Sequence, residues 1–113
     1  MTKGIQRLRT AETSKYMAAA LEMFGQKWAL RVIWELRVGP LNFRALQTAC
    51  GSVSPSVLQR RLHELRKLML IEKIPRLGYR LSARGERLFQ VLVMLNKWCA
   101  DFRPGLPSSN NSD

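Results

Sequence analysis

The stretch SVSPSVLQRRLHELRKLMLIEKIPRLGYRLS, residues 52–82, decides the fold class of this chain. It begins with Ser54 and Pro55, a pair typical of a helix start, because the hydroxyl can accept a backbone N–H and proline needs no partner for one. Leucines at helical spacing then predict a helix over residues 55–69. Two short apolar runs joined by a turn containing Pro and Gly predict a β-hairpin directly after it.

The sequence before this stretch predicts three helices. Thr13 or Ser14 can cap the first, which ends at Gly25. Residues 26–38 predict a second helix that is apolar nearly all round, and such a helix is usually central. A short extended segment and a helix over residues 43–50 follow, with Asn42 as a possible cap.

A last helix is predicted over residues 83–102, capped by Ser82. Two helices joined by a tight turn, followed at once by a hairpin, form a winged helix-turn-helix. The predicted fold class is therefore α+β, mostly α, with additional helices at both ends of the winged-helix core.

With 113 residues, the chain suits one domain. We expect a basic N-terminal arm over residues 1–12, the folded domain over 13–103 and a polar, disordered tail over 104–113. Residues 13–25 and 83–102 hold the first and last predicted helices of this domain.

The formal net charge of the chain is +11, and 46% of its residues are hydrophobic. A small, foldable and strongly basic domain most often binds a polyanion, usually nucleic acid. The longest apolar run is too short to span a bilayer, and the N-terminus lacks the apolar core of a signal peptide. We therefore expect a cytoplasmic protein without a membrane partner.

On a helical wheel, the leucines of residues 55–69 face the core and a polar, basic set lies opposite. Arg and Gln can bond base edges in the major groove, whereas Ser and Lys suit phosphates. Nine Lys or Arg stand against three Glu between Ser54 and Arg87. The expected DNA-binding residues are Ser54, Ser56, Gln59, Arg60, Arg61, His63, Arg66 and Lys67 on the helix, and Lys73, Arg76 and Arg80 on the wing.

Arg61 differs from the others because it borders the apolar stripe. Its stem can be buried while its guanidinium reaches a phosphate, or it can pair with a carboxylate at the edge of the core such as Glu35. The sequence leaves both possibilities open.

Apolar residues on the last predicted helix cover more than one core face requires, which indicates a partner. A second copy of the chain is the favoured partner, because two-fold dimers bind operators of this type. The expected interface residues are Met17, Leu21, Phe24, Leu88, Leu92, Leu95, Trp98 and Phe102.

Catalysis and metal binding find little support. His63 is the only histidine and lies on a basic helix face, and Cys50 and Cys99 have no metal-ligand spacing. Cys50 precedes the end of a helix and Cys99 lies on an apolar stripe, so both are expected to be reduced and inert. No cofactor is expected; the tryptophans could line a pocket for a small-molecule effector that the sequence does not identify.

The sequence resembles the HxlR family of winged-helix transcription regulators, which are relatives of the MarR group. The resemblance is carried, in the family order, by GQKWALRVIWEL, GPLNFRAL, VSPSVLQRRLHEL, YRLSARG and LNKW. It implies a homodimer that binds operator DNA, with the first and last helices, residues 13–25 and 83–102, as the dimerisation helices.

The chain departs from the family pattern in three places. Lys15 stands where many members have a reactive cysteine, the wing is shorter than is usual, and Arg44 replaces a small capping residue. The first departure argues against redox or electrophile sensing at position 15, because lysine lacks the thiol. The second predicts a reduced reach of the wing into the minor groove.

The predicted function is sequence-specific binding of double-stranded DNA by a homodimeric transcription regulator at a pseudo-palindromic operator. Two alternatives stay open, a winged helix used for protein interaction and an architectural DNA binder without sequence preference. The basic helix face argues against the first, and Gln59, Arg60 and His63 argue mildly against the second.

Overall fold

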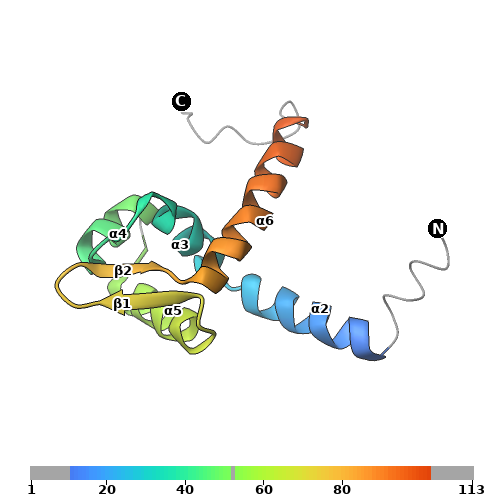
Figure 1. Cartoon of the computed structure of the whole chain (residues 1–113), viewed down its shortest axis with the longest axis horizontal. Helices are drawn as coiled ribbons and strands as arrows, with labels where there is room; N and C mark the ends of the chain where they lie inside the picture. Colours follow the sequence, from blue (N-terminus) through green and yellow to red (C-terminus); the bar gives the residue numbers. More distant parts are fainter. Residues whose placement is uncertain (1–10, 52, 103–113) are drawn as a thin grey trace.

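The computed structural model describes residues 11–51 and 53–102, so most of the expected arm and the expected tail lie outside the described residues. The elements and their order are shown in Figure 1. They are α2 (Ala11–Phe24), α3 (Ala29–Glu35), the 3₁₀ helix η1 (Leu36–Val38), α4 (Phe43–Cys50), α5 (Pro55–Lys67), β1 (Ile71–Ile74), β2 (Gly78–Leu81) and α6 (Ala83–Ala100).

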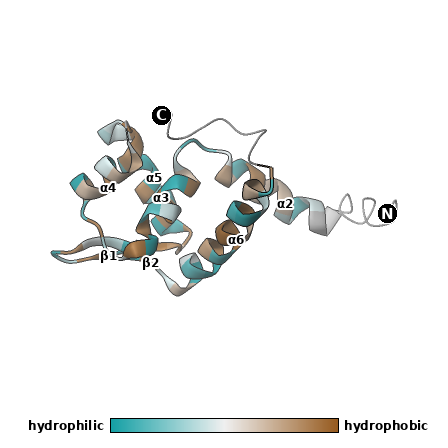
Figure 2. Cartoon of the chain, turned by 90° about the horizontal axis from the view of Figure 1, so that it is seen from above, coloured by the Kyte–Doolittle hydropathy of each residue, from teal (hydrophilic) through white to brown (hydrophobic). Residues whose placement is uncertain are grey.

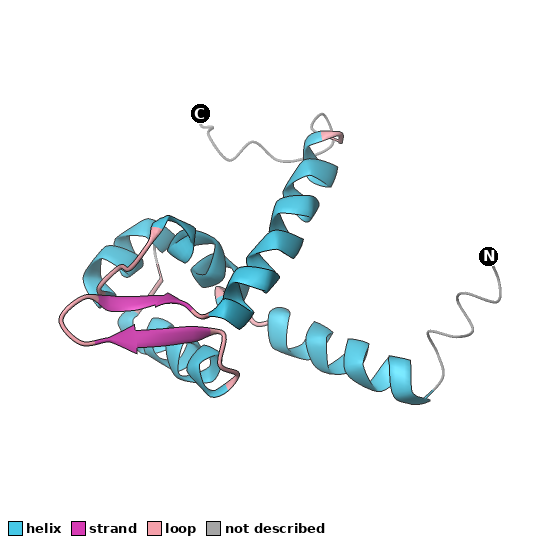
Figure 3. Cartoon of the chain, viewed as in Figure 1, coloured by secondary structure: helices cyan, strands magenta, loops and turns pink. Residues whose placement is uncertain are grey.

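The winged helix-turn-helix fold is confirmed. α4 and α5 form the helix-turn-helix, and β1 and β2 form the hairpin beside α5 (Figure 3). The strands are antiparallel, with Ile71 opposite Leu81 and Ile74 opposite Gly78. The predicted extended segment before α4 adds an isolated bridge between Leu41 and Tyr79.

The core of the domain lies between α3, α4, α5, the hairpin and the first half of α6. α3 is central as predicted, and its Val32 and Ile33 are fully buried. α5 contributes its leucine stripe, which is buried as the wheel predicts. The core members are Val32, Ile33, Leu36, Leu46, Cys50, Val53, Leu58, Leu62, Leu65, Leu70, Ile71, Tyr79, Leu81 and Leu92.

Helix boundaries differ from the predictions at several ends. α2 begins at Ala11, so Thr13 and Ser14 lie within the helix and not at its first position as predicted. α3 begins only at Ala29, because Trp28 adopts a left-handed conformation with φ 80°. α5 and α6 end two residues earlier than predicted, at Lys67 and Ala100.

Three predicted helix caps are confirmed. The side chains of Asn42, Ser54 and Ser82 accept hydrogen bonds from the backbone N–H groups of Ala45, Val57 and Gly85, at 2.8, 3.3 and 3.0 Å. These bonds satisfy donors that the first turn of a helix otherwise leaves without a partner. Local polar residues therefore fix where α4, α5 and α6 begin.

Replacing Asn42 with alanine is expected to lower the free energy of unfolding by about 1 kcal/mol, because the 2.8 Å bond to the Ala45 N–H is lost. Urea unfolding at a fixed protein concentration measures this change. Asn42→Asp is the control, since aspartate also caps helices and should retain most of the stability. Equal stability of the alanine variant would contradict a capping role.

α2 and the second half of α6 project from the body of the domain (Figure 1). Leu21 on α2 and Met94 on α6 are 67% and 71% exposed. Apolar residues recur along α6 up to its C-terminal end (Figure 2). Both projecting helices thus leave apolar side chains uncovered in a single chain.

Candidate nucleic-acid interface

The outward face of α5 presents polar and basic side chains together. The capping bond of Ser54 orients the start of the helix, and the buried leucines Leu58, Leu62 and Leu65 hold it against the core. The opposite face is consequently directed to solvent. Its exposed residues, all predicted from the sequence, are Ser56, Gln59, Arg60, His63, Arg66 and Lys67.

The outward face of α5 carries three exposed cations, Arg60, Arg66 and Lys67. Among the described residues, no carboxylate forms an ion pair with Arg60, Arg66 or Lys67. Unpaired cations concentrated on one face attract polyanions, and each that meets a phosphate releases a counterion. The face therefore has the charge and the hydrogen-bond donors that duplex DNA requires.

The wing places its three predicted cations differently. Arg76 lies in the turn between the strands with φ 70°, and Lys73 stands 5.9 Å from the centre of the Tyr79 ring. Arg80 bonds Glu72 directly across the hairpin, from Nε to Oε1 at 3.0 Å. Both side chains are about half exposed, and such surface ion pairs are weak. The charge of Arg80 is therefore partly neutralised, but its side chain stays accessible to DNA.

The structure corrects the placement of Arg61, which was grouped with the DNA-facing residues. The residue is only 8% exposed, and its guanidinium points into the domain. It donates to the carbonyl of Lys27 at 2.8 Å, to Glu64 at 3.2 Å and to Gln26 at 3.3 Å. The acidic partner of Arg61 is thus Glu64, three positions later on the same helix, and not Glu35 as the sequence suggested.

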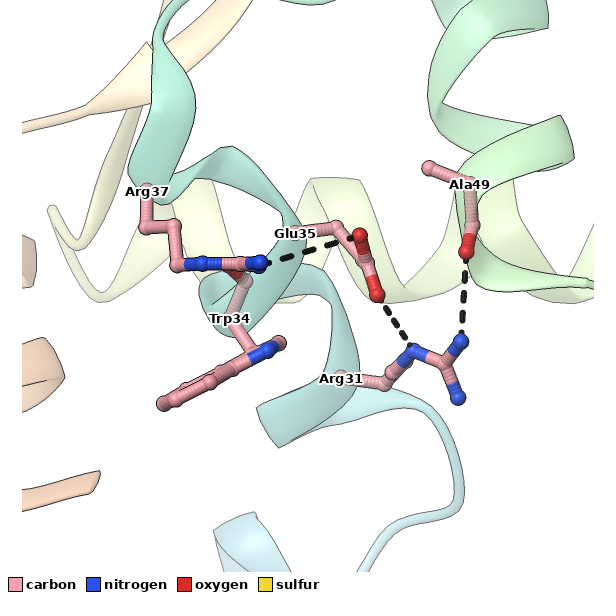
Figure 4. A network of polar contacts seen from close by, with 5 residues as sticks. All are labelled: Arg31, Trp34, Glu35, Arg37 and Ala49. Atoms are coloured by element: carbon pink, nitrogen blue, oxygen red, sulfur yellow. Dashed lines mark hydrogen bonds and ion pairs between the residues drawn. The ribbon is translucent and has the colours of Figure 1, made fainter. Parts of the chain in front are cut away.

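Glu35 instead belongs to a polar network on α3, drawn in Figure 4. Its carboxylate accepts from Arg31 Nε at 2.7 Å and lies 3.9 Å from Arg37. Arg31 also donates to the carbonyl of Ala49 at 3.2 Å. The network therefore joins α3 to the end of α4, the first helix of the helix-turn-helix.

The two cysteines lie in different environments. Cys50 is buried in the core as a free thiol, and burial raises its pKa, with nearby Arg31 opposing and Glu35 adding to the shift. Cys99, which was expected on an apolar stripe, is partly exposed and lines a groove between α3 and α6. The raised pKa leaves Cys50 as a thiol at neutral pH.

Iodoacetamide at pH 8 is expected to modify Cys99 at least about tenfold faster than Cys50, because thiolate content and access control the rate. Mass spectrometry of peptides from a time course measures both rates. In 8 M urea, about the concentration needed to unfold most small domains, the rates should become similar. Faster modification of Cys50 in the folded protein would contradict its burial.

The apolar surface only partly matches the predicted dimer interface. Met17, Leu21, Leu95, Trp98 and Phe102 are exposed by 48–67%. Phe24 and Leu88 pack partly against the core of the same chain, and Leu92 belongs to that core with 8% exposure.

Leu92 is therefore corrected from interface to core, because it faces α3 beside the Trp34–Phe89 ring contact at 5.4 Å. The prediction also missed exposed apolar residues on the same two helices. These are Tyr16, Val91 and Met94. Helical spacing could have found Val91 and Met94, since they precede Trp98 by two turns and one turn, respectively.

The described residues contain neither a metal-ligand cluster nor a membrane-spanning helix. No group of three His, Cys, Asp or Glu residues among them could hold a metal ion. No helix within these ranges is long and apolar enough to cross a membrane.

The fold and the basic face of α5 place this chain in the class of winged helix-turn-helix proteins. Residues 23–105 match the HxlR-like helix-turn-helix family, so the chain belongs to that family. Its members are transcription regulators and not enzymes. The sequence resemblance to this family is thereby confirmed.

Two curated relatives illustrate the match. The chain is 33% identical over 91 residues to the uncharacterized HTH-type transcriptional regulator MT3179 of Mycobacterium tuberculosis (strain CDC 1551 / Oshkosh), which covers 75% of this chain and 57% of that protein. It is 27% identical to the regulator YvaP of Bacillus subtilis, covering 74% of this chain and 82% of YvaP. The chain thus spans little more than half of the mycobacterial relative.

Solved structures share the fold over most of the chain. Quinone-bound YodB from B. subtilis superposes with a TM-score of 0.70 at 26% identity, covering 76% of this chain and 96% of YodB. A MarR-family regulator from Enterococcus faecalis V583 gives a TM-score of 0.68 at 27% identity, covering 85% of this chain and 93% of that protein.

Proposed function

We propose that this protein is a sequence-specific transcription regulator that binds operator DNA as a homodimer. The observation that carries the proposal is the exposed face of α5, where Gln59, Arg60 and His63 lie beside Arg66 and Lys67, and no carboxylate of the described residues pairs with these arginine and lysine side chains. In this arrangement α5 enters the major groove, and the wing rests on the neighbouring backbone or minor groove. The protein would then act in the cytoplasm, where chromosomal operators are found.

The roles along α5 follow from its geometry. The N-terminal half of a recognition helix contacts base edges, so Ser56, Gln59 and Arg60 would select the sequence, together with His63 one turn further along the same face. Arg66 and Lys67, nearer the C-terminal end, would bind phosphates and fix the register. The hairpin has a turn of only three residues between Ile74 and Gly78, so Arg76 would reach the backbone more readily than the floor of the minor groove.

The two-fold arrangement is supported by the uncovered apolar residues of α2 and α6. A second copy that covered both helices would present two α5 helices on one side. Their separation on DNA would be about 34 Å, one helical turn, or a multiple of it. The operator would then be pseudo-palindromic.

A small-molecule effector is a further element of the proposal. The groove between α3 and α6 has a volume of about 370 Å³ and is mainly apolar, with Trp34 and Cys99 among its lining residues. Since YodB was solved with a bound quinone, a quinone is the first compound to test for release of this protein from DNA. The pocket lies where α6 meets the helix that supports the helix-turn-helix.

Capture of genomic fragments at about 0.15 M salt with excess random competitor DNA tests the proposed function. Enrichment of a few fragments that share an inverted repeat is the expected result. Uniform capture would indicate an architectural binder. No capture would indicate a protein-interaction module or a requirement for a ligand.

Replacing Lys67 with alanine is expected to weaken binding to all sequences alike, because a phosphate contact carries no sequence information. The slope of log K against log salt should decrease by about 0.9, the value for one released phosphate contact on duplex DNA. Fluorescence anisotropy on operator and scrambled duplexes at several salt concentrations measures it. A loss confined to one base pair of the operator would contradict the phosphate role.

A further inference from the structure

Arg61 connects the proposed recognition helix to the turn between α2 and α3. Among the described residues it is the only buried charged residue. Two of its three hydrogen bonds leave α5, to the Lys27 carbonyl at 2.8 Å and to the Gln26 side chain at 3.3 Å. The third bond runs from Arg61 Nη1 to Glu64 Oε1 on the same helix, at 3.2 Å. The guanidinium therefore spans two parts of the chain more than 30 positions apart.

The turn that Arg61 contacts is strained and lacks a cap of its own. Trp28 has φ 80°, a region that bulky side chains rarely adopt. No side chain caps the start of α3, although Ser and Asn side chains cap α4, α5 and α6. The bond from Arg61 reaches the carbonyl just before Trp28 and so supplies an external support for this turn.

The direction of α2 depends on this turn. Most of α2 between Lys15 and Glu22 is exposed, and Phe24 at its end packs partly against the core. Gly25 and Gln26 continue directly from α2 by bonds to Leu21 and Met23, at 2.9 and 3.4 Å. A change in the turn would therefore swing α2 as a whole while the core stayed in place.

We propose that Arg61 is a positioning residue that fixes the angle between α2 and α5. This inference rests on the proposed homodimer, in which α2 belongs to the interface. Since α5 carries the DNA-contacting face, the angle sets how far apart and in what orientation two copies of α5 are held. Arg61 then determines which spacing of half-sites the dimer accepts, without contacting DNA itself.

The test compares operators whose half-sites have been moved apart, with wild type, Arg61→Gln and Arg61→Lys. Inserting two base pairs rotates one half-site by about 70° and should cost the wild type about tenfold in affinity. Arg61→Gln should lose less than about threefold, because a looser α2 adapts to either spacing. Affinity for an isolated half-site should remain unchanged, since the exposed face of α5 is intact.

Arg61→Lys is the conservative variant. A lysine can donate to the Lys27 carbonyl but cannot also bond Glu64 and Gln26 in the fork geometry of arginine. It should recover part of the spacing preference. Arg84→Gln removes the same charge from an exposed position on α6 and should retain the wild-type preference.

Full spacing preference in both Arg61 variants would overturn the inference. So would an equal loss of affinity on half-sites and complete operators, which would indicate a DNA contact or general damage to the fold. If the wild type itself shows no spacing preference, the result would contradict the proposed homodimer and not the role of Arg61.

A measurement without DNA separates these two failures. Spin labels on cysteines introduced at Ala19 of α2 and Gln59 of α5, in a Cys99→Ser background, report the distance between these helices within one chain. Dilution with unlabelled protein removes distances between subunits. The distribution should be narrow with Arg61 and broader in Arg61→Lys and Arg61→Gln; identical distributions would overturn the positioning role.

Discussion

Trp98→Glu is expected to convert the dimer into folded monomers and to weaken operator binding by at least about 100-fold, because linked half-sites gain that much from bivalent binding. Trp98 is 58% exposed in the single chain, and its ring lies 4.7 Å from that of Phe102. A carboxylate buried between two copies would lack a partner, which would cost about 3–5 kcal/mol of the free energy of dimerisation. Sedimentation and anisotropy on the same samples measure mass and affinity.

Trp98→Phe is the matched control, because it keeps an aromatic side chain at the position. It should remain dimeric and bind the operator nearly as well as the wild type. Affinity of the glutamate variant for an isolated half-site should be unchanged, and its circular dichroism should stay helical. A glutamate variant that remains a dimer with full operator affinity would contradict the assignment of α6 to the interface.

Arg60→Ala is expected to cost about 1–3 kcal/mol of binding free energy at one base position and to relax specificity there. An arginine can bond both major-groove acceptors of a guanine. Arg60 lies exposed on the N-terminal half of α5, and no carboxylate in the described part of the chain forms an ion pair with it. Binding to operators with each possible base at every position measures the change.

The stability of the protein should hardly change, because no described side chain depends on Arg60 for a hydrogen bond. Arg60→Lys is the control, since lysine keeps the charge but loses the fork geometry that bonds both acceptors. It should retain affinity for non-specific DNA while losing part of the preference. Equal weakening of Arg60→Ala on every sequence would instead make Arg60 a phosphate contact.

The central part of the fold could be predicted because its signals are local. Ser54, Pro55 and the leucine spacing define α5, and the turn residues around Gly78 define the hairpin. Asn42 and Ser82 mark the starts of their helices in the same way. Each of these features depends on neighbours within one or two helical turns, which the sequence displays directly.

The features that were missed depend on contacts between distant segments. α3 begins at Ala29 because the chain turns at left-handed Trp28, and Arg61, 33 positions later, bonds the preceding carbonyl. No local sequence pattern predicts a hydrogen bond between segments this far apart. Leu92 was misplaced because α6 is apolar over much of its circumference, so only the position of α3 decides which side is core.

The candidate site was predictable in composition but not in availability. The wheel placed Gln59, Arg60 and His63 on one face, as the structure has them. The helical wheel could not show that Arg80 forms an ion pair with Glu72 across the hairpin, because the strand register decides that pair. Distinguishing free from paired cations requires the three-dimensional arrangement.

The most direct test of the central claim is methylation protection of guanine N7 on an enriched operator, because this atom lies in the major groove, where α5 is proposed to bind. The account predicts two protected patches with centres about 10 base pairs, or a multiple of this, apart. Arg60→Ala should lose protection at one guanine in each patch. Specific binding with every guanine N7 left reactive would contradict the placement of α5 in the major groove.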